Sequence, residues 1–416
     1  MSKDNLNVYT RSRELYNRAL NVIPTGVYGH LGPSNGCAIP VEAYPIFSKK
    51  AKGTYFWDAD DNRFIDYMCA YGPNILGYGD KEVDDAAIAQ LRKGNCVTIP
   101  DEVMVDFAEL LTQTVKKDWA FFCKNGGDVT SLAIMTARYA TGRKKIVMVK
   151  NGYHGVAPWT QKIGYAGVLE EDVSNNLYIH WNDVQEFENL IKQYPGQIAA
   201  FISTPYYHPT FEDNKLPAEN YWKQMREVCT KNGIVLIIDD IRCGFRLDIE
   251  GSDARYGIKA DLITFCKAIA NGYNVSALCG VDSLKGAVSD VFYTGSYWLS
   301  AEPFAAGVAC INKMKRDNTI SQLRFIADKL HTGMKEVAKK NGRELIITGE
   351  PVMWFMRHAD DESFFMHQAW VAECVKRGVF FTNHHNHFIN SAITDEDIAF
   401  TLDVADRAYK AIKDKF

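Results

Sequence analysis

Two residues that could act together on a carbonyl group each follow an apolar segment of the sequence. Asp239 follows the run 234–238, and Lys267 follows the run 262–266. Ligands bind at the carboxyl edge of an α/β sheet, so two such strands would bring both side chains to one binding site. Desolvation there would lower the pKa of Lys267 and make its amine a nucleophile. Taken singly, each residue is more often a solvated strand end or a lysine stem lying along apolar surface.

Two glycine-containing segments earlier in the chain could bind an anion and a flat ring. The Asn-Gly-Gly turn at 125–127 stands between a predicted strand and a predicted helix. Its glycines would let backbone N–H groups approach an anion, which the helix N-terminus attracts. It matches neither the P-loop nor the dinucleotide-binding glycine pattern. Tyr153 lies in a glycine-flanked loop after the predicted strand 146–149, where it could stack on a planar ligand or pack within the loop.

The order of these segments along the chain is more specific than any one of them. A phosphate-binding turn, an aromatic loop, a strand-end acid and a strand-end lysine match the needs of pyridoxal 5'-phosphate (PLP). Its phosphate needs a helix N-terminus, its ring a stacking partner, its pyridine nitrogen a carboxylate and its aldehyde an amine. The sequence therefore predicts a PLP enzyme in which Lys267 forms a Schiff base with the cofactor.

The sequence also resembles the class III aminotransferases, which belong to the fold-type-I superfamily of PLP enzymes. Within them it is most similar to the branch of glutamate-1-semialdehyde aminomutase. The motifs that carry the resemblance run nearly end to end and lie at 22–27, 66–77, 141–143, 153–155, 239–246, 267–273 and 394–398. The resemblance implies an α/β fold with a mostly parallel central sheet in a large domain and a smaller α+β domain.

The resemblance also implies a role for each residue of the cofactor site. Lys267 and Asp239 are the expected catalytic residues. The residues expected to bind PLP are Asn125, Gly126, Gly127, Tyr153, Asp239, Ile241, Lys267 and Ser296. In such dimers a hydroxyl of the partner chain reaches the phosphate, and this role falls to Ser296 or to Thr294. A homodimer is therefore expected.

Departures from the family pattern bear on the substrate. The semialdehyde enzyme carries an arginine for the substrate carboxylate in the stretch that reads Tyr-Gly-His-Leu-Gly-Pro at 28–33, and no arginine is present here. We therefore do not expect glutamate-1-semialdehyde as the substrate. The residues expected to contact a small-molecule amine or carbonyl substrate are His30, Tyr71, Arg242 and His385. Arg242 could hold an anion or pair with an acid such as Asp240. One of the histidines at 384–387 is expected to line a substrate pocket, which we favour over a metal site.

The expected reaction is transamination by a ping-pong mechanism, in which an amine donor leaves its amino group for a carbonyl acceptor. An aminomutase or epimerase would use the same residues and retain the product in the pocket. A non-catalytic PLP-binding protein is disfavoured because both Lys267 and Asp239 are present. A dehydrogenase is disfavoured because no GxGxxG segment follows an early strand.

The elements that must position these residues alternate between helical and strand patterns. Apolar runs at 119–122, 146–149, 199–202 and 234–238 are separated by helical segments, which is typical of a buried, mostly parallel sheet. A hairpin is predicted at 53–70. We expect three parts: an N-terminal segment at 1–75 that joins the smaller lobe, a large PLP-binding domain at 76–305, and a C-terminal small domain at 306–416.

Composition excludes several classes of protein. The 416 residues carry a formal net charge of -4, so the basic footprint of a nucleic-acid-binding protein is lacking. No apolar stretch is long enough to cross a bilayer, and the start of the sequence lacks a secretory pattern. The ten cysteines form no CxxC pair and read as small apolar residues in a reducing compartment. We therefore expect a cytoplasmic enzyme with no membrane or nucleic-acid partner.

Overall fold

A computed structural model describes residues 6–27 and 42–416, which fall into two compact units. The larger unit consists of residues 81–209 and 215–320. The smaller unit consists of the described residues up to 80 together with 210–214 and 321–416. His30, one of the predicted substrate-binding residues, lies outside the described residues.

A seven-stranded sheet forms the centre of the larger unit, in the order β4-β10-β9-β8-β7-β5-β6. Its strands are β4 (Trp119–Cys123), β5 (Lys145–Val149), β6 (Asn176–Ile179), β7 (Ile198–Ser203), β8 (Val235–Asp239), β9 (Leu262–Phe265) and β10 (Ser276–Gly280). The pairs from β9 through β8, β7 and β5 to β6 are parallel, whereas β10 runs antiparallel to both of its neighbours. The predicted mostly parallel α/β sheet is confirmed.

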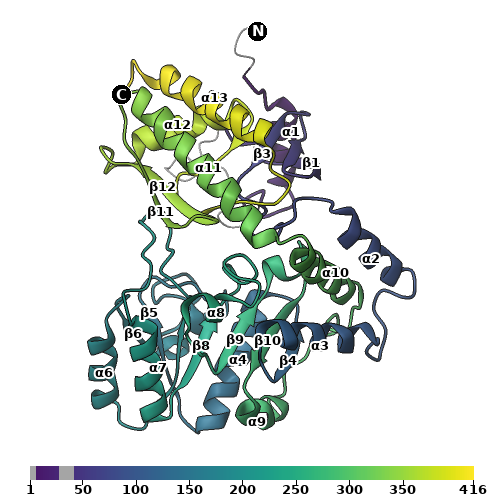
Figure 1. Cartoon of the computed structure of the whole chain (residues 1–416), viewed down its shortest axis with the longest axis vertical. Coiled ribbons are helices and arrows are strands. Elements are labelled where there is room, and N and C mark those ends of the chain that lie inside the picture. The colour runs from purple at the N-terminus through teal and green to yellow at the C-terminus, as the bar shows by residue number, and fades with distance from the viewer. Residues whose placement is uncertain (1–5, 28–41) are drawn as a thin grey trace. The chain divides into compact units, whose positions relative to one another are not determined.

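Strands β7, β8 and β9 are buried along their whole length because helices of this unit cover the sheet. Such two-sided burial explains why these strands read as continuous apolar runs in the sequence. The helices of the larger unit are α2 (Lys81–Leu91), α3 (Val103–Val115), α4 (Gly126–Thr141), α5 (Glu170–Val173), α6 (Val184–Gln193), α7 (Tyr221–Asn232), α8 (Ser252–Tyr256), α9 (Lys285–Asp290) and α10 (Glu302–Arg316). Figure 1 shows their arrangement around the sheet.

The smaller unit contains two sheets and four helices. One sheet has the order β1 (Ser48–Lys52), β2 (Tyr55–Asp58), β3 (Arg63–Asp66) and β13 (Val379–Phe380), and the other has the order β11 (Leu345–Glu350), β12 (Met353–His358) and β14 (His387–Phe388). The helices are α1 (Thr10–Ala19), α11 (Thr319–Lys340), α12 (Phe365–Val375) and α13 (Asp395–Ile412). Strands β2 and β3 form the predicted hairpin, and β3 pairs in parallel with β13.

The two units differ from the predicted ranges 1–75, 76–305 and 306–416 at both boundaries, and the segment 210–214 belongs to the smaller unit. Helix α10 belongs to the larger unit, because it packs on α2 and α3. That the predicted ranges fold as separate domains stays a prediction. None of the helices in the described part of the chain is long and apolar enough to span a bilayer.

Candidate active site

A cavity of about 540 Å³ in the larger unit collects most of the predicted cofactor residues. It lies where β7, β8 and β9 end and where α4 begins. Its lining includes eight of the predicted site residues, namely Asn125, Gly126, Gly127, Tyr153, Asp239, Ile241, Arg242 and Lys267. The sheet topology therefore brings segments that are far apart in the sequence to one cavity, as the carboxyl edge of a parallel sheet does.

Lys267 lies two residues after the end of β9 and begins a short 3-10 helix (Lys267–Ala270). Its backbone is left-handed, with a φ of 49°, which is uncommon for a residue with a side chain. Burial, and after it the nearby charge of Arg242, lower the pKa of Lys267 to about 7. The lowered pKa favours the neutral amine, which is the form that attacks a carbonyl carbon.

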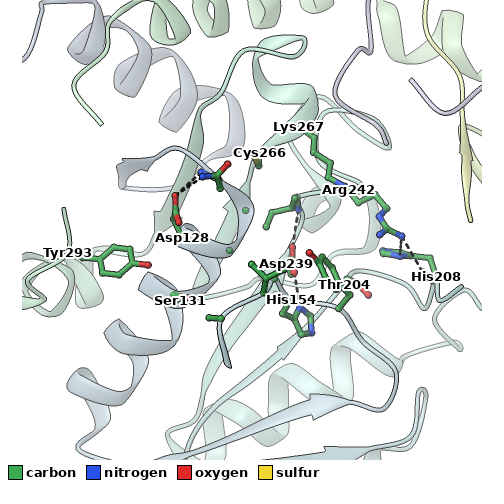
Figure 2. A pocket seen from close by; sticks show the side chains of 18 residues that line it. Asp128, Ser131, His154, Thr204, His208, Asp239, Arg242, Cys266, Lys267 and Tyr293 are labelled. Atoms are coloured by element: carbon green, nitrogen blue, oxygen red, sulfur yellow. Dashed lines mark hydrogen bonds and ion pairs between the residues drawn. The ribbon is translucent and has the colours of Figure 1, made fainter. Parts of the chain in front are cut away.

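Asp239 is the last residue of β8 and is buried, with 4% of its surface exposed. One carboxylate oxygen, Oδ2, lies 2.7 Å from Nδ1 of His154, and the other accepts a hydrogen bond from the backbone N–H of Ile241 at 3.2 Å. These two contacts fix the carboxylate at the cavity (Figure 2). Buried carboxylates need such partners, and His154 and the backbone of Ile241 supply them here.

His154 is a residue that the sequence interpretation did not assign to the site. It is 2% exposed, and its backbone oxygen accepts a hydrogen bond from Thr130 Oγ1 at 2.6 Å. Gly155 follows it with a φ of 117°, and a Cβ there would lie 2.8 Å from the Cα of Gly127. Only glycine fits this close approach, which packs the loop onto the start of α4. The Tyr-His-Gly sequence after β5 was the available signal for this loop.

The N-terminus of α4 lines the cavity. Asn125 precedes the helix, and its backbone N–H donates to Asp128 at 2.9 Å. The first backbone N–H groups of a helix have no partner within the helix, and the helix dipole makes this end attractive to an anion. A Cβ at Gly126 would lie 2.9 Å from Cδ1 of Ile241, so this glycine lets the helix start approach Ile241.

Tyr153 and Ile241, the two predicted ring-stacking residues, both line the cavity. Ile241 is half-buried and packs on the main apolar core of the larger unit. Tyr153 is 63% exposed, so it stands at the open side of the cavity. Ser131 and Tyr293 add hydroxyl groups that the sequence interpretation did not assign.

Arg242 points toward His208 rather than toward an acid. Its Nη1 lies 3.2 Å from Nδ1 of His208 and 3.5 Å from the backbone oxygen of the same residue. Asp240, the alternative partner, accepts hydrogen bonds from the backbone N–H and the hydroxyl of Ser252. Burial raises the pKa of Asp240 to about 8.

The remaining predicted residues do not line this cavity. Ser296 and Thr294 lie in the segment between α9 and α10, where the backbone oxygen of Ser296 contacts the thiol of Cys96. Tyr71 and His385 belong to the smaller unit and contact each other edge to face, with ring centroids 5.1 Å apart. Among the residues placed by the structure, no group of three or more histidines, cysteines and acids is arranged to hold a metal ion.

Comparison with known proteins identifies the family. Residues 38–408 match the model of the class III aminotransferases, and the chain belongs to this family. It is 40% identical over 404 residues to the aminopentol aminotransferase of Sphingopyxis macrogoltabida, covering 97% of this chain and 94% of the relative. It is 31% identical to the 3-aminobutyryl-CoA aminotransferase of Cloacimonas acidaminovorans, covering 97% of each. Glutamate-1-semialdehyde 2,1-aminomutases are also among its relatives.

A solved structure with the same overall fold is the PLP internal aldimine form of the FumI protein from Sphingopyxis sp. MTA144. It is 40% identical in sequence, covers 98% of this chain and 97% of its own, and has a TM-score of 0.94. The predictions of a fold-type-I protein, of PLP as the cofactor and of aminotransferase activity are confirmed. The cavity fits this cofactor, because it offers an amine of lowered pKa, a buried carboxylate and a helix N-terminus.

Proposed function

We propose that this aminotransferase takes the amino group from an amine whose amino-bearing carbon has no carboxylate, and passes it to a carbonyl acceptor. The names of the two aminotransferase relatives support this donor class: an aminopentol is an amino polyol, and 3-aminobutyryl-CoA carries its amino group away from the carboxyl carbon. The observation that carries the proposal is that Lys267 and Asp239 meet the start of α4 in one cavity.

Each residue of the cavity has a separate proposed role. When bound, PLP supplies an aldehyde carbon that combines with amines and a protonated ring that accepts electrons. The N–H groups at Gly126 and Gly127 would hold its phosphate, and Asp239, fixed by His154, would keep the proton on its ring nitrogen. Ile241 and Tyr153 would each pack on one face of the ring. Lys267 would move a proton between the donor carbon and the cofactor through Nζ, for which a pKa near neutrality is suited.

We also propose that the enzyme works as a homodimer in the cytoplasm. Large apolar side chains stand exposed in the cavity lining, namely Tyr153 at 63% and Val156 at 69%. Others are exposed in the segment between α9 and α10, namely Phe292 at 90% and Tyr297 at 71%. Exposed apolar groups of this size favour burial against another surface. A second copy would bring its Ser296 or Thr294 to the phosphate, as the family resemblance implies. The described cysteines are free, which supports a reducing compartment.

Single-turnover spectroscopy tests the donor class. The purified PLP enzyme is mixed with an aliphatic 2-amino alcohol, a 3-amino acid thioester or an ordinary α-amino acid, and loss of the cofactor's visible absorption band is followed. We expect the first two classes to convert the cofactor to its amine form at least tenfold faster than the third. Conversion by α-amino acids alone would contradict the proposal. Steady turnover of a single compound without an acceptor would instead favour an aminomutase.

A further inference from the structure

Part of the cavity wall continues along the chain into the smaller unit. Thr204 and His208, which follow β7, line the cavity, and Figure 2 shows both side chains there. Neither is among the residues expected to bind the cofactor, so this part of the wall is left for a substrate. Residues 210–214 then belong to the smaller unit, and the chain returns to the larger unit at 215. We call residues 208–214 the tether.

The base of the tether is closed within the larger unit. The backbone N–H of Tyr207 donates to the oxygen of Lys215 at 3.0 Å, and the N–H of Lys215 donates back to Tyr207 at 2.9 Å. The ammonium group of Lys215 also lies 5.2 Å from the ring centroid of Tyr207. His208 directly follows this closed pair. A change in the course of the tether would therefore act first on His208 and through it on the cavity wall.

The tip of the tether is held by residues of the smaller unit. Both carboxylate oxygens of Asp213 accept hydrogen bonds from Arg357, one from Nε at 2.9 Å and one from Nη2 at 2.8 Å. The backbone N–H of Asn214 donates to Oγ1 of Thr348 at 3.0 Å, and its side-chain amide donates to Oδ1 of Asn386 at 2.6 Å. A two-point pair between a guanidinium and a carboxylate fixes orientation as well as distance.

Phe211 has a backbone conformation that needs such support. Its φ is 60°, in the left-handed region that residues with a side chain rarely adopt. Its N–H donates to the backbone oxygen of His384 at 2.9 Å, and its ring centroid lies 5.3 Å from that of His384 and 6.1 Å from that of Phe364. Strain of this kind persists only where the surroundings over-determine it, and it gathers at functional sites. These contacts therefore hold the tether in one defined course.

We propose that the tether positions the substrate side of the cavity wall, and that Asp213 and Arg357 are positioning residues of the active site, although both lie outside its lining. Their ion pair fixes the tip, the backbone pair of Tyr207 and Lys215 fixes the base, and His208 stands between them. The position of the wall matters because a reactant misplaced by about 1 Å reacts roughly 100-fold more slowly.

Two carbonyl-capture reagents of different size test this role on the PLP-loaded enzyme. Hydroxylamine and O-benzylhydroxylamine both condense with the aldehyde carbon of the cofactor and displace Lys267, so neither needs to resemble the natural substrate. Loss of the visible absorption band gives the two rate constants. We expect Asp213→Asn to raise the ratio of the larger reagent's rate constant to that of hydroxylamine by roughly fivefold or more, because a wall that is no longer held admits the larger reagent more readily. The rate constant of hydroxylamine should stay nearly unchanged.

Matched variants separate positioning from a general loss of stability. Arg357→Gln weakens the same pair from the other side and should raise the ratio equally, and the double variant should not exceed either single one, because the two partners act as a unit. Asp213→Glu keeps the charge and should restore most of the natural ratio. Asp360→Asn weakens another ion pair of the smaller unit, with Arg343 at 2.9 Å, and should leave the ratio unchanged. An unchanged or lower ratio in Asp213→Asn would overturn the proposal.

Hydrogen exchange of the PLP-loaded enzyme locates the change in the chain. In Asp213→Asn we expect faster exchange in the peptide 204–215 and the natural rate in the peptide that contains α4. The Kd for PLP should also stay unchanged, since the residues expected to bind the cofactor lie on other segments. Faster exchange throughout the smaller unit with an unchanged ratio would show that the ion pair only stabilises the fold, and the proposal would then be wrong.

Discussion

At the scale of single residues, the account depends on the protonation of Lys267. A solvated lysine is almost fully charged at neutral pH, whereas burial next to Arg242 brings the pKa of this one to about 7. The pKa is lowered, so the neutral amine is present above about pH 7 and is lost as the pH falls below it. The lowered pKa therefore favours reaction of this amine with a carbonyl group at neutral pH.

The pH dependence of PLP uptake by the apoenzyme tests this protonation. We expect the second-order rate constant to rise with pH around a midpoint near 7 and to level off by about pH 8. A rate that keeps rising toward pH 10 would show an ordinary lysine. Arg242→Gln should move the midpoint upward, because removing a nearby positive charge makes protonation of Lys267 easier.

His154 is expected to act through Asp239. His154→Ala removes the partner of a buried carboxylate oxygen, which is typically a loss of about 1.5–3 kcal/mol. We expect PLP affinity and the rate of the donor half-reaction to fall roughly 10- to 100-fold. His154→Gln, which can still donate a hydrogen bond, should recover part of the loss. The exposed His180 offers a control, and equal effects of His180→Ala and His154→Ala would contradict this role.

Sequence patterns located the main site residues but not all of their partners. Lys267, Asp239 and Tyr153 could be predicted because each follows an apolar run that ends at the same sheet edge. His154 and His208 could not, because which loop side chain turns inward depends on contacts made in three dimensions. His154 follows β5 and its partner Asp239 ends β8, and β7 lies between these two strands in the sheet. The contact between them therefore depends on the strand order as well.

At the scale of elements, the start of α4 is expected to bind the phosphate of the cofactor. Gly126→Ala would place a Cβ 2.9 Å from Cδ1 of Ile241, so Ile241 or the helix start must shift. We expect the Kd for PLP, measured by fluorescence quenching, to rise at least tenfold. Gly286→Ala in α9 is the matched control, because a Cβ there meets nothing within 4 Å. Equal Kd values for the two variants would contradict the expected role of this helix start.

Elements with strong apolar patterns could be predicted, and those with mixed patterns could not. The strands at β4, β5, β7 and β8 coincide with predicted apolar runs. Strand β6 (Asn176–Ile179) is a partly exposed edge strand, and β10 (Ser276–Gly280) consists partly of small residues, so neither has the composition of a buried run. The antiparallel course of β10 follows from pairing with β4 and β9, which the local sequence does not encode.

At the scale of the whole molecule, acid should destabilise the smaller unit first. Burial lowers the pKa of His358 to about 4 and of His387 to about 3, and both are in this unit. The neutral form is favoured in the folded state, so stability is fully present above the unfolded pKa of about 6.5 and is lost as the pH falls toward 4 and 3.

The segment 210–214 belongs to the smaller unit, although it lies in the sequence between two parts of the larger one. This was not predicted from the sequence, because only long-range contacts place the segment.

Urea unfolding of the apoenzyme at several pH values measures this loss. Between pH 7 and pH 4.5 we expect the free energy of unfolding to fall by on the order of 2 kcal/mol for each such histidine. Hydrogen exchange should show the earliest loss of protection in β12, β14 and α12. A free energy that stays constant over this range, or earliest loss in the central sheet of the larger unit, would contradict the expectation.

The measurement that tests the central claim most directly is chemical trapping of the cofactor. The purified enzyme is reconstituted with PLP, reduced with borohydride, digested and analysed by mass spectrometry. We predict a pyridoxyl group on the peptide that contains Lys267, and its absence in Lys267→Ala, which should still fold by circular dichroism. A pyridoxyl group on another lysine, or a colourless protein with no trapped cofactor, would contradict the account.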